Sequence, residues 1–217
     1  MSQTNTPLRA RREGGGTPKM KGRFEIRSET GVLKDVLLGP AESFRWMGLE
    51  NAAWSSLVRD TMRKGYKFDK QLAMRQHREM VDAYHQAGVT THFLPLDMTN
   101  PYQVYARDSS FMSPYGAVVC QLANPRRRGE YAAVLRFYLE NNIPIYDMVS
   151  AGNFEGGDFN ILRDGLALVG FTDHRSEEVA ARQISEWFLK EGWEIKYAPI
   201  DQFYVHIDLM VCMLNEH

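Results

Sequence analysis

Apolar and polar positions along this chain repeat one order of predicted elements. Three segments have the pattern of a helix, then a polar or glycine stop, then a short apolar strand. The predicted helices are residues 69–87, 129–140 and 176–191, and the strands after them are VTTHFLPL, IPIYDMV and WEIKYAPI. The stops at residues 88, 142 and 192 are 54 and 50 residues apart. This spacing predicts a structural unit of about 50 residues that recurs along the chain.

Paired apolar runs precede the second and third helices. They are QVYARDSSFM with AVVCQL, separated by SPYG, and FNIL with LALVGF, separated by RDG. Asp-Gly between two such runs is a strong hairpin signal, so the predicted unit is strand–strand–helix–strand. Ser176 is the predicted N-cap of the third helix. The last two helices carry apolar stripes expected to face a core, formed by Val134, Leu135, Tyr138 and Leu139, and by Val179, Ile184, Phe188 and Leu189.

The remaining runs extend this pattern in both directions. The first unit begins with GVLKDVLLGP and carries an insertion, residues 41–68, whose aromatic side chains predict either a lid over a site or a surface elaboration. A fourth unit begins with a predicted strand, VHIDLMVCML, and the sequence ends where a hairpin turn is expected, at Asn215-Glu216. Repeats of this length predict a solenoid or a propeller-like ring. A sequence that ends in the middle of a unit would leave a strand edge unpaired, and natural proteins avoid such edges. We therefore expect this sequence to cover only part of a ring.

Composition narrows the class of protein. The chain has 217 residues, a formal net charge of −1, and no apolar run near the ~20 residues of a membrane span. The balanced charge argues against a nucleic-acid-binding surface. Two cysteines form no disulfide framework, so a cytoplasmic location is expected. Residues 1–23 predict a disordered tail before a domain at 24–217, with a targeting peptide as the alternative.

Carboxylates and a histidine recur in successive units. Arg107-Asp108 is followed by Glu155-Gly156-Gly157-Asp158 and then by His206-Ile207-Asp208. If the last motif is a strand, its histidine and aspartate share one face. A guanidinium is a planar, permanently charged group that carboxylates bind in bidentate fashion, and a histidine can carry protons at neutral pH. The three motifs therefore predict a site that holds a guanidinium and moves protons around it.

The repeated unit and these motifs, in this order, resemble the guanidine-modifying pentein superfamily, which includes arginine deiminase, dimethylarginine dimethylaminohydrolase and the amidinotransferases. The resemblance covers about residues 25–217. It implies an α/β fold, a pentein-type propeller of five units of which this chain has about three and a half, and no cofactor. It also implies a nucleophilic cysteine near the C-terminus of a longer chain. That cysteine has no counterpart here, so we expect the chain to be truncated before it.

The resemblance further implies roles for single side chains. His206 is the implied general acid/base, Glu155 holds and orients the substrate, and Asp108 and Asp208 bind the guanidinium. Asp158 is assigned to substrate binding, with support of the local backbone as its alternative. For the carboxylate of an amino-acid substrate the resemblance implies Arg127 and Arg175, the former with a register uncertain by one residue. The alternatives are a surface ion pair at Arg107-Asp108, a simple bend at Gly156-Gly157 and a solvated arginine loop.

Neither cysteine has the pattern of a nucleophile. Cys120 lies in the apolar run AVVCQL and is expected to be buried. Cys212 is six strand residues from His206, which is roughly 20 Å. A metal site is not expected either, because no second histidine stands at ligand spacing.

The predicted reaction is hydrolysis of a C–N bond in a guanidino compound, arginine or methylarginine-like, through a cysteine-linked thiouronium adduct. His206 would protonate the departing amine and then activate water. Amidino transfer to an amine is the alternative within enzymes, and a non-catalytic binding module or inactive fragment is the alternative outside them. Tyr102 and Tyr105, bulky groups before Arg107, suggest a substrate other than plain arginine. The expected partner is this small molecule, with no nucleic acid or membrane and with homo-oligomerisation left open.

Overall fold

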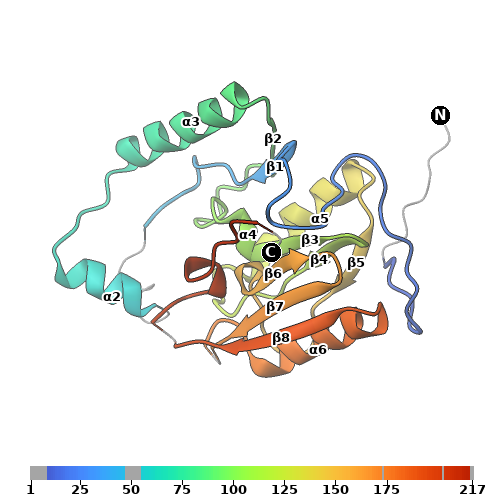
Figure 1. Ribbon diagram of the computed structural model, residues 1–217. Coiled ribbons are helices and arrows are strands. Elements are labelled where there is room, and N and C mark those ends of the chain that lie inside the picture. The colour runs from blue at the N-terminus through green and yellow to red at the C-terminus, as the bar shows by residue number, and fades with distance from the viewer. Residues whose placement is uncertain (1–8, 47–54, 173, 202, 216–217) are drawn as a thin grey trace.

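The computed structural model describes residues 9–46, 55–172, 174–201 and 203–215, which form three small sheets with helices against them (Figure 1). The first sheet pairs β1 (Asp35–Leu38) with β2 (Thr90–Phe93). The second contains β3 (Ser110–Ser113), β4 (Gly116–Val119) and β5 (Ile145–Met148). The third contains β6 (Phe159–Arg163), β7 (Leu166–Phe171) and β8 (Glu194–Pro199). The long helices are α3 (Lys70–Gln86), α5 (Tyr131–Glu140) and α6 (Glu178–Lys190).

The second and third sheets confirm the predicted strand–strand–helix–strand unit. In each, the first two strands form an antiparallel hairpin, and the second strand pairs in parallel with the strand after the helix. A parallel pair requires such a crossover connection. The predicted stops also hold, because Gly88, Asn142 and Gly192 all have a positive φ, between 54° and 83°, at the helix ends. Closure into a five-unit ring remains a prediction.

Two apolar clusters form the core and join neighbouring units. One surrounds α6 and includes Phe159 and Phe188, while Phe111 of the second sheet stacks on Phe159 with ring centroids 4.2 Å apart. The other lies beneath α5 and includes Val134 and Tyr138. Strands of adjacent units therefore contribute to one interior, which fixes the positions of the turns that connect them.

The predicted helix stripes are only half correct. Val134, Tyr138, Ile184 and Phe188 are buried as expected. Val179, Leu189 and Leu139 are instead exposed, by 54%, 52% and 42%. The buried face of α6 is formed by Ala180, Ile184, Trp187 and Phe188, and on a helix of 3.6 residues per turn Val179 and Leu189 fall outside that face. Ser176 also lies outside the helix, whose N-cap is Glu177.

Two motifs predicted as strands form short helical turns. Arg107 and Asp108 lie in α4 (Ala106–Ser109), and the run after Val205 forms the 3₁₀ turn Ile207–Leu209. In the second case the carboxylate of Asp158 accepts a hydrogen bond from the Ile207 N–H at 2.9 Å. This tertiary contact removes a backbone donor that a strand ladder would need, and the apolar run does not extend as a strand.

The segment 9–23 differs from the predicted disordered tail. Ala10 and Arg11 donate backbone hydrogen bonds to Ile145 and Tyr146 of β5 at 2.6 and 3.0 Å, which covers the edge of that strand. Further along, the Thr17 N–H and hydroxyl both bond the Glu191 carboxylate, at 2.9 and 2.5 Å. Residues 1–8 lie outside the described residues. The Gly-rich middle of this segment and its lack of apolar periodicity predict disorder, but these polar contacts are made to groups far away in sequence.

The insertion contains α2 (Ser56–Arg63), whose first turn is capped by the Ser55 hydroxyl. Phe44 makes edge-to-face contacts with Phe68, Tyr102 and Tyr105. These contacts place aromatic side chains of the insertion beside the segment that precedes Arg107. Residues 47–54 of the insertion, which include the aromatic residue Trp54, lie outside the described residues, and the lid remains a prediction. No helix of the described chain has the length and apolarity to cross a bilayer.

Candidate active site

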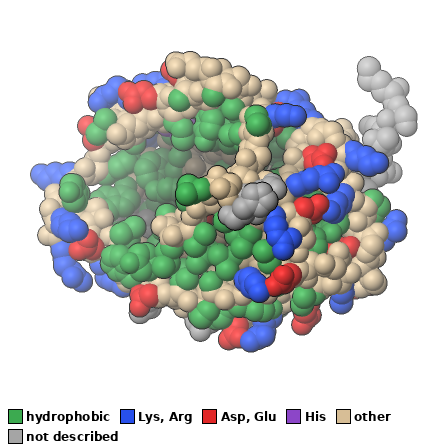
Figure 2. All heavy atoms as spheres, viewed as in Figure 1, with side chains coloured by type: hydrophobic (Ala, Val, Ile, Leu, Met, Phe, Trp, Pro, Cys, Tyr) green, Lys and Arg blue, Asp and Glu red, His purple; other side chains and the backbone are tan. Residues whose placement is uncertain are grey.

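A cavity of about 730 Å³ opens between the first unit and the two larger sheets. Figure 2 shows the hollow on this face and the hydrophobic side chains around it. Its polar end contains five of the seven predicted site residues, namely Asp108, Arg127, Arg175, His206 and Asp208. The other walls are largely apolar, with contributions from Leu38, Trp46, Val58, Met80 and Tyr105.

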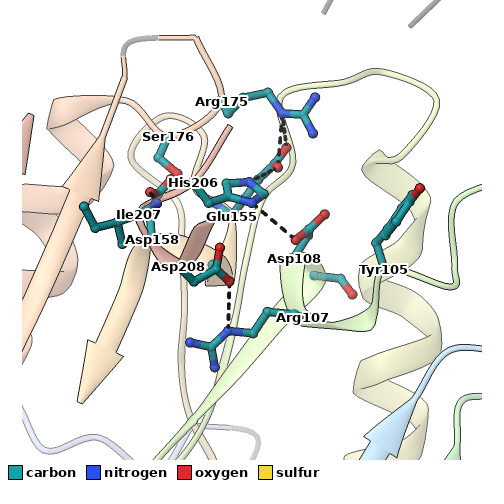
Figure 3. A network of polar contacts seen from close by, with 12 residues as sticks. Tyr105, Arg107, Asp108, Glu155, Asp158, Arg175, Ser176, His206, Ile207 and Asp208 are labelled. Carbon is teal, nitrogen blue, oxygen red and sulfur yellow. Dashed lines mark hydrogen bonds and ion pairs between the residues drawn. The ribbon is translucent and has the colours of Figure 1, made fainter. Parts of the chain in front are cut away.

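Three separate units bring their chemistry together at this end (Figure 3). Asp108 comes from α4, Glu155 precedes the 3₁₀ turn Gly156–Asp158, and His206 precedes the 3₁₀ turn Ile207–Leu209. The Nε2 of His206 lies 2.5 Å from Glu155 Oε2, and its Nδ1 lies 3.7 Å from Asp108 Oδ1. The imidazole thus lies between two buried carboxylates, as the motif order suggested.

The glycine pair lets these turns approach one another. A Cβ on Gly157 would lie 2.9 Å from His206 Cγ and Nδ1. A Cβ on Gly156 would lie 2.2 Å from the carbonyl oxygen of Arg107 and 2.9 Å from that of Ser110. Gly156-Gly157 is therefore more than a bend, because the first glycine accommodates the α4 backbone and the second accommodates the imidazole.

The two arginines expected to bind a substrate carboxylate pair with carboxylates of the protein. Arg175 Nε donates to Glu155 at 3.1 Å. Arg127 Nη1 donates to Asp108 Oδ2 at 2.7 Å, and its Nε and Nη2 each donate to Glu130 at 2.9 Å. Sequence reasoning missed Glu130, although Arg127 and Glu130 stand at the i,i+3 spacing that allows side chains to meet on a helical turn.

The remaining acids differ in their surroundings. Asp208 lines the cavity, and its Oδ2 lies 3.8 Å from Arg107 Nε. Asp158 is fully buried, bonds the Ile207 N–H, and is hydrogen-bonded by Ser176. These contacts favour the alternative in which Asp158 supports the local backbone. The hydroxyl of Ser176 also accepts the Glu155 N–H at 3.1 Å, so this serine joins both acidic residues of the third unit.

Burial and ion pairing shift the pKa values in opposite directions. Burial opposes ionisation of Glu155, but Arg175 and the His206 hydrogen bond outweigh it and lower its pKa to about 2. Burial also disfavours the imidazolium, yet Asp108 and Glu155 raise the pKa of His206 to about 9. For Asp158 burial dominates and raises its pKa to about 6. His206 is thus held protonated at neutral pH, ready to donate a proton.

These shifts couple folding to pH. His206 has a higher pKa folded, about 9, than its ordinary 6.5, so its stabilisation is complete below pH 6.5 and is lost as pH rises through 9. Glu155 stabilises the fold above its ordinary pKa of 4.5, and this contribution is lost as pH falls through about 2. Asp158 acts oppositely to Glu155, because its raised pKa means that ionisation between pH 3.8 and about 6 destabilises the fold.

Neither cysteine lies where it could attack a substrate in the cavity. Cys120 is buried as predicted, and burial, reinforced by the Glu155 charge, raises the pKa of its thiol well above the usual range. Cys212 is exposed, and the strand that was to carry it is not formed. Neither is among the residues that line the cavity.

Asp108, Glu155 and His206 also have a spacing that could hold a metal ion, with candidate ligand atoms within 4.8 Å of one another. The donor set fits a metal poorly, because a histidine ligand must be deprotonated and both carboxylates already contact arginines. An environment that favours protonated His206 fits an organic cation and proton transfer better.

The chain is a member of the guanidine-modifying pentein superfamily, as its motifs predicted, because a family model from that superfamily matches most of it. The sequence profile of one family within it, described as "N,N dimethylarginine dimethylhydrolase, eukaryotic", matches residues 46–210, and the chain belongs to this family. The uncharacterized protein YkgA of Bacillus subtilis (strain 168) is 26% identical over 199 residues, 92% of this chain and 66% of that protein. An uncharacterized protein of Aeropyrum pernix is 27% identical over 119 residues, 54% of this chain and 44% of that protein. The chain thus spans less than two thirds of these relatives.

Solved structures agree on the fold. A dimethylarginine dimethylaminohydrolase bound as an adduct with S-methyl-L-thiocitrulline has a TM-score of 0.61 at 21% identity, covering 78% of this chain and 62% of that one. The Pseudomonas aeruginosa enzyme, complexed with citrulline, has a TM-score of 0.62 at 20% identity, covering 81% of this chain and 68% of that one. The amidinotransferase SxtG of Microseira wollei has a TM-score of 0.62 at 13% identity, covering 85% of this chain and 65% of that one.

Proposed function

We propose that this protein hydrolyses a C–N bond of a guanidino compound, arginine or methylarginine-like. The single observation that supports this most strongly is the imidazole of His206, which lies between the buried carboxylates of Glu155 and Asp108 at the polar end of the cavity. Buried carboxylates bind a planar cation strongly, and a protonated imidazole beside them can supply a proton to a leaving amine. Structures similar in fold are reported with citrulline and with L-arginine.

In the proposed reaction the nucleophile is the cysteine that the family resemblance implies, which is neither Cys120 nor Cys212. Its thiolate attacks the central guanidinium carbon, and the C–N bond to the departing amine breaks. His206 gives its proton to that amine, which leaves a thiouronium adduct. Water then attacks the adduct, His206 takes a proton from it, and the thiol departs as the ureido product forms. Asp108 and Asp208 bind the guanidinium, and Glu155 keeps the imidazole oriented. Cys120 is excluded as the nucleophile by its burial and raised pKa.

The test uses protein expressed from the complete gene, with arginine and its methylated derivatives as substrates and the ureido product as readout. We expect Asp108→Ala to raise KM and His206→Ala mainly to lower kcat, by about 10²–10⁴-fold for a lost acid/base group. His85→Ala is the matched control, because that histidine is exposed at the end of α3 and its side chain bonds Thr91, away from the cavity. An unchanged kcat in His206→Ala contradicts the mechanism.

The same assay separates the other functions. A new guanidino product formed on addition of an amine acceptor indicates amidino transfer, which SxtG represents among the similar folds. Tight guanidine binding without turnover indicates a binding module. The cytoplasmic location and any homo-oligomer remain predictions.

A further inference from the structure

Glu130 is a buried acid that the proposed reaction does not use. It ends the 3₁₀ turn Arg128–Glu130 at the start of α5 and is 2% exposed. Both of its carboxylate oxygens accept hydrogen bonds from one partner, Arg127, through Nε and Nη2 at 2.9 Å each. A buried acid of this kind is stable only when paired, and a bidentate arginine is the strongest available partner.

This pairing fixes the orientation of Arg127. A guanidinium is a rigid fork, so two bonds to Glu130 determine where the third nitrogen points. That nitrogen, Nη1, donates to Asp108 Oδ2 at 2.7 Å. The ring of Tyr105 covers the guanidinium, with Cζ 5.7 Å from the ring centroid. Arg127 is itself only 3% exposed, so it is engaged by protein groups on several sides.

The position of Asp108 follows from that of Arg127. One carboxylate oxygen of Asp108 is held by Arg127, and the other lies 3.7 Å from His206 Nδ1 on the side of the cavity. Glu130 therefore acts on the site through two successive contacts, without lining the cavity.

Charge gives the arrangement a second consequence. Arg127 alone would neutralise Asp108 and weaken its attraction for a cation. With Glu130 included, the three groups carry two negative charges and one positive, and their net charge of −1 offsets the net charge of +1 on protonated His206, Glu155 and Arg175. Because these groups are buried, solvent screens that charge only weakly.

We propose that Glu130 is a positioning residue that holds Asp108 through Arg127 and makes the site prefer a cationic guanidinium over a neutral ureido group. The inference rests on the proposed function, because it concerns the same ligand class. It also gives Arg127, which lines the cavity, the role of supporting Asp108 in addition to its predicted role at the carboxylate of the substrate.

The experiment compares arginine with citrulline. The two differ at the end of the side chain, where arginine has a positively charged guanidinium and citrulline has a neutral ureido group. Kd is measured at pH 7 by rapid-mixing tryptophan fluorescence, since Trp46 lines the cavity and the signal precedes turnover. In Glu130→Gln we expect Kd for arginine to rise about 10-fold, as for one unit charge removed at roughly 10 Å in an effective dielectric of about 20. Kd for citrulline should change by less than about 3-fold by the same reasoning.

Glu140→Gln is the matched control, because Glu140 is an exposed residue at the other end of α5. It should leave both Kd values unchanged. A second variant, Glu130→Gln with Arg127→Met, removes one charge of each sign and restores the net charge of −1. Its preference for arginine over citrulline should return towards that of the wild type, even though both ligands bind more weakly because Asp108 is no longer held.

The outcomes are distinguishable. If the wild type binds neither ligand, the proposed function fails. If the wild type binds arginine and Glu130→Gln weakens both ligands equally, or neither, the positioning inference is overturned while the function stands. A double variant that folds and keeps the low preference of Glu130→Gln also overturns it. Should Glu130→Gln alone fail to fold, the double variant decides, because it also removes the buried Arg127 charge that Glu130→Gln leaves without its acid.

Discussion

Gly157 is a sharp test of the site geometry, because it separates damage to the site from damage to the fold. An alanine Cβ there would lie 2.8 Å from Asp208 Oδ2 and 2.9 Å from His206 Cγ, where ordinary contacts are 3.4–4 Å. His206 must therefore retreat by at least 0.5 Å, the difference between 2.9 and 3.4 Å. The atoms in the way belong to the side chains of His206, which precedes the 3₁₀ turn, and Asp208, which lies in it, and side chains yield more easily than backbone.

The expected loss follows from this displacement. The His206–Glu155 contact at 2.5 Å lengthens, and a charge-assisted hydrogen bond is worth about 1.5–3 kcal/mol. Since a misplacement of ~1 Å costs about 10²-fold in rate, half of that predicts a fall in kcat/KM of about 10-fold or more. The free energy of unfolding should fall by about 1–3 kcal/mol, as for other overpacked sites.

Gly156→Ala should behave differently. Its Cβ meets the backbone carbonyl oxygens of Arg107 and Ser110 at 2.2 and 2.9 Å, and these cannot swing aside. We expect a larger loss of stability than in Gly157→Ala, with poor recovery of folded protein. Gly129→Ala is the control, because its nearest neighbour would be Asn100 Oδ1 at 3.5 Å and its φ is not positive.

The assay is kcat/KM for a guanidino substrate together with urea unfolding of the three variants. A Gly157→Ala variant with wild-type kcat/KM refutes the inference that this glycine makes room for the imidazole. Equal loss of stability in Gly156→Ala and Gly157→Ala refutes the distinction between backbone and side-chain crowding.

Two further predictions concern titratable groups. The free energy of unfolding should fall by about 1–3 kcal/mol between pH 6.5 and 9.5 as His206 loses its proton, as its pKa of about 9 requires. Measured by urea unfolding, the free energy of unfolding should depend less on pH in His206→Asn and as much as in the wild type in His85→Asn. A pH dependence retained in His206→Asn contradicts the assignment. A disulfide reagent should label exposed Cys212 rapidly in the folded protein and Cys120 only after unfolding, because burial raises the pKa of the Cys120 thiol. Rapid labelling of native Cys120 would contradict this.

The elements that sequence predicts well are those with local physical causes. Gly88, Asn142 and Gly192 end helices because a left-handed residue is needed there, and all three were placed correctly. Asp164-Gly165 turns the hairpin between β6 and β7 for the same kind of reason. Asp69 caps α3 through its side chain. In each case the determining residues lie within a few positions of the feature.

The features that sequence reasoning misplaced depend on distant groups. The VHIDLMVCML run has the apolar content of a strand, but Asp158, 49 residues earlier, bonds the Ile207 N–H, and the run forms a turn instead. Arg127 lines the cavity, but its contacts with Glu130 and Asp108 were not predicted. The grouping of His206 with Glu155 was nevertheless anticipated, because motif order in a repeated unit carries information that local propensity lacks.

The buried groups of the site form a row of alternating charge, and this bears on the role of Arg175. In order, Glu130, Arg127, Asp108, His206, Glu155 and Arg175 each contact the next, so three acids face three cations when His206 is protonated. A guanidinium that enters such a row adds a positive charge that must be compensated. Release of the His206 proton would remove the acid that the leaving amine needs. Movement of Arg175 away from Glu155 leaves that proton in place and frees one carboxylate for the substrate. It also frees the guanidinium of Arg175 for the opposite end of an amino-acid ligand, so its contact with Glu155 and its predicted role in binding a carboxylate are compatible as successive states of one side chain.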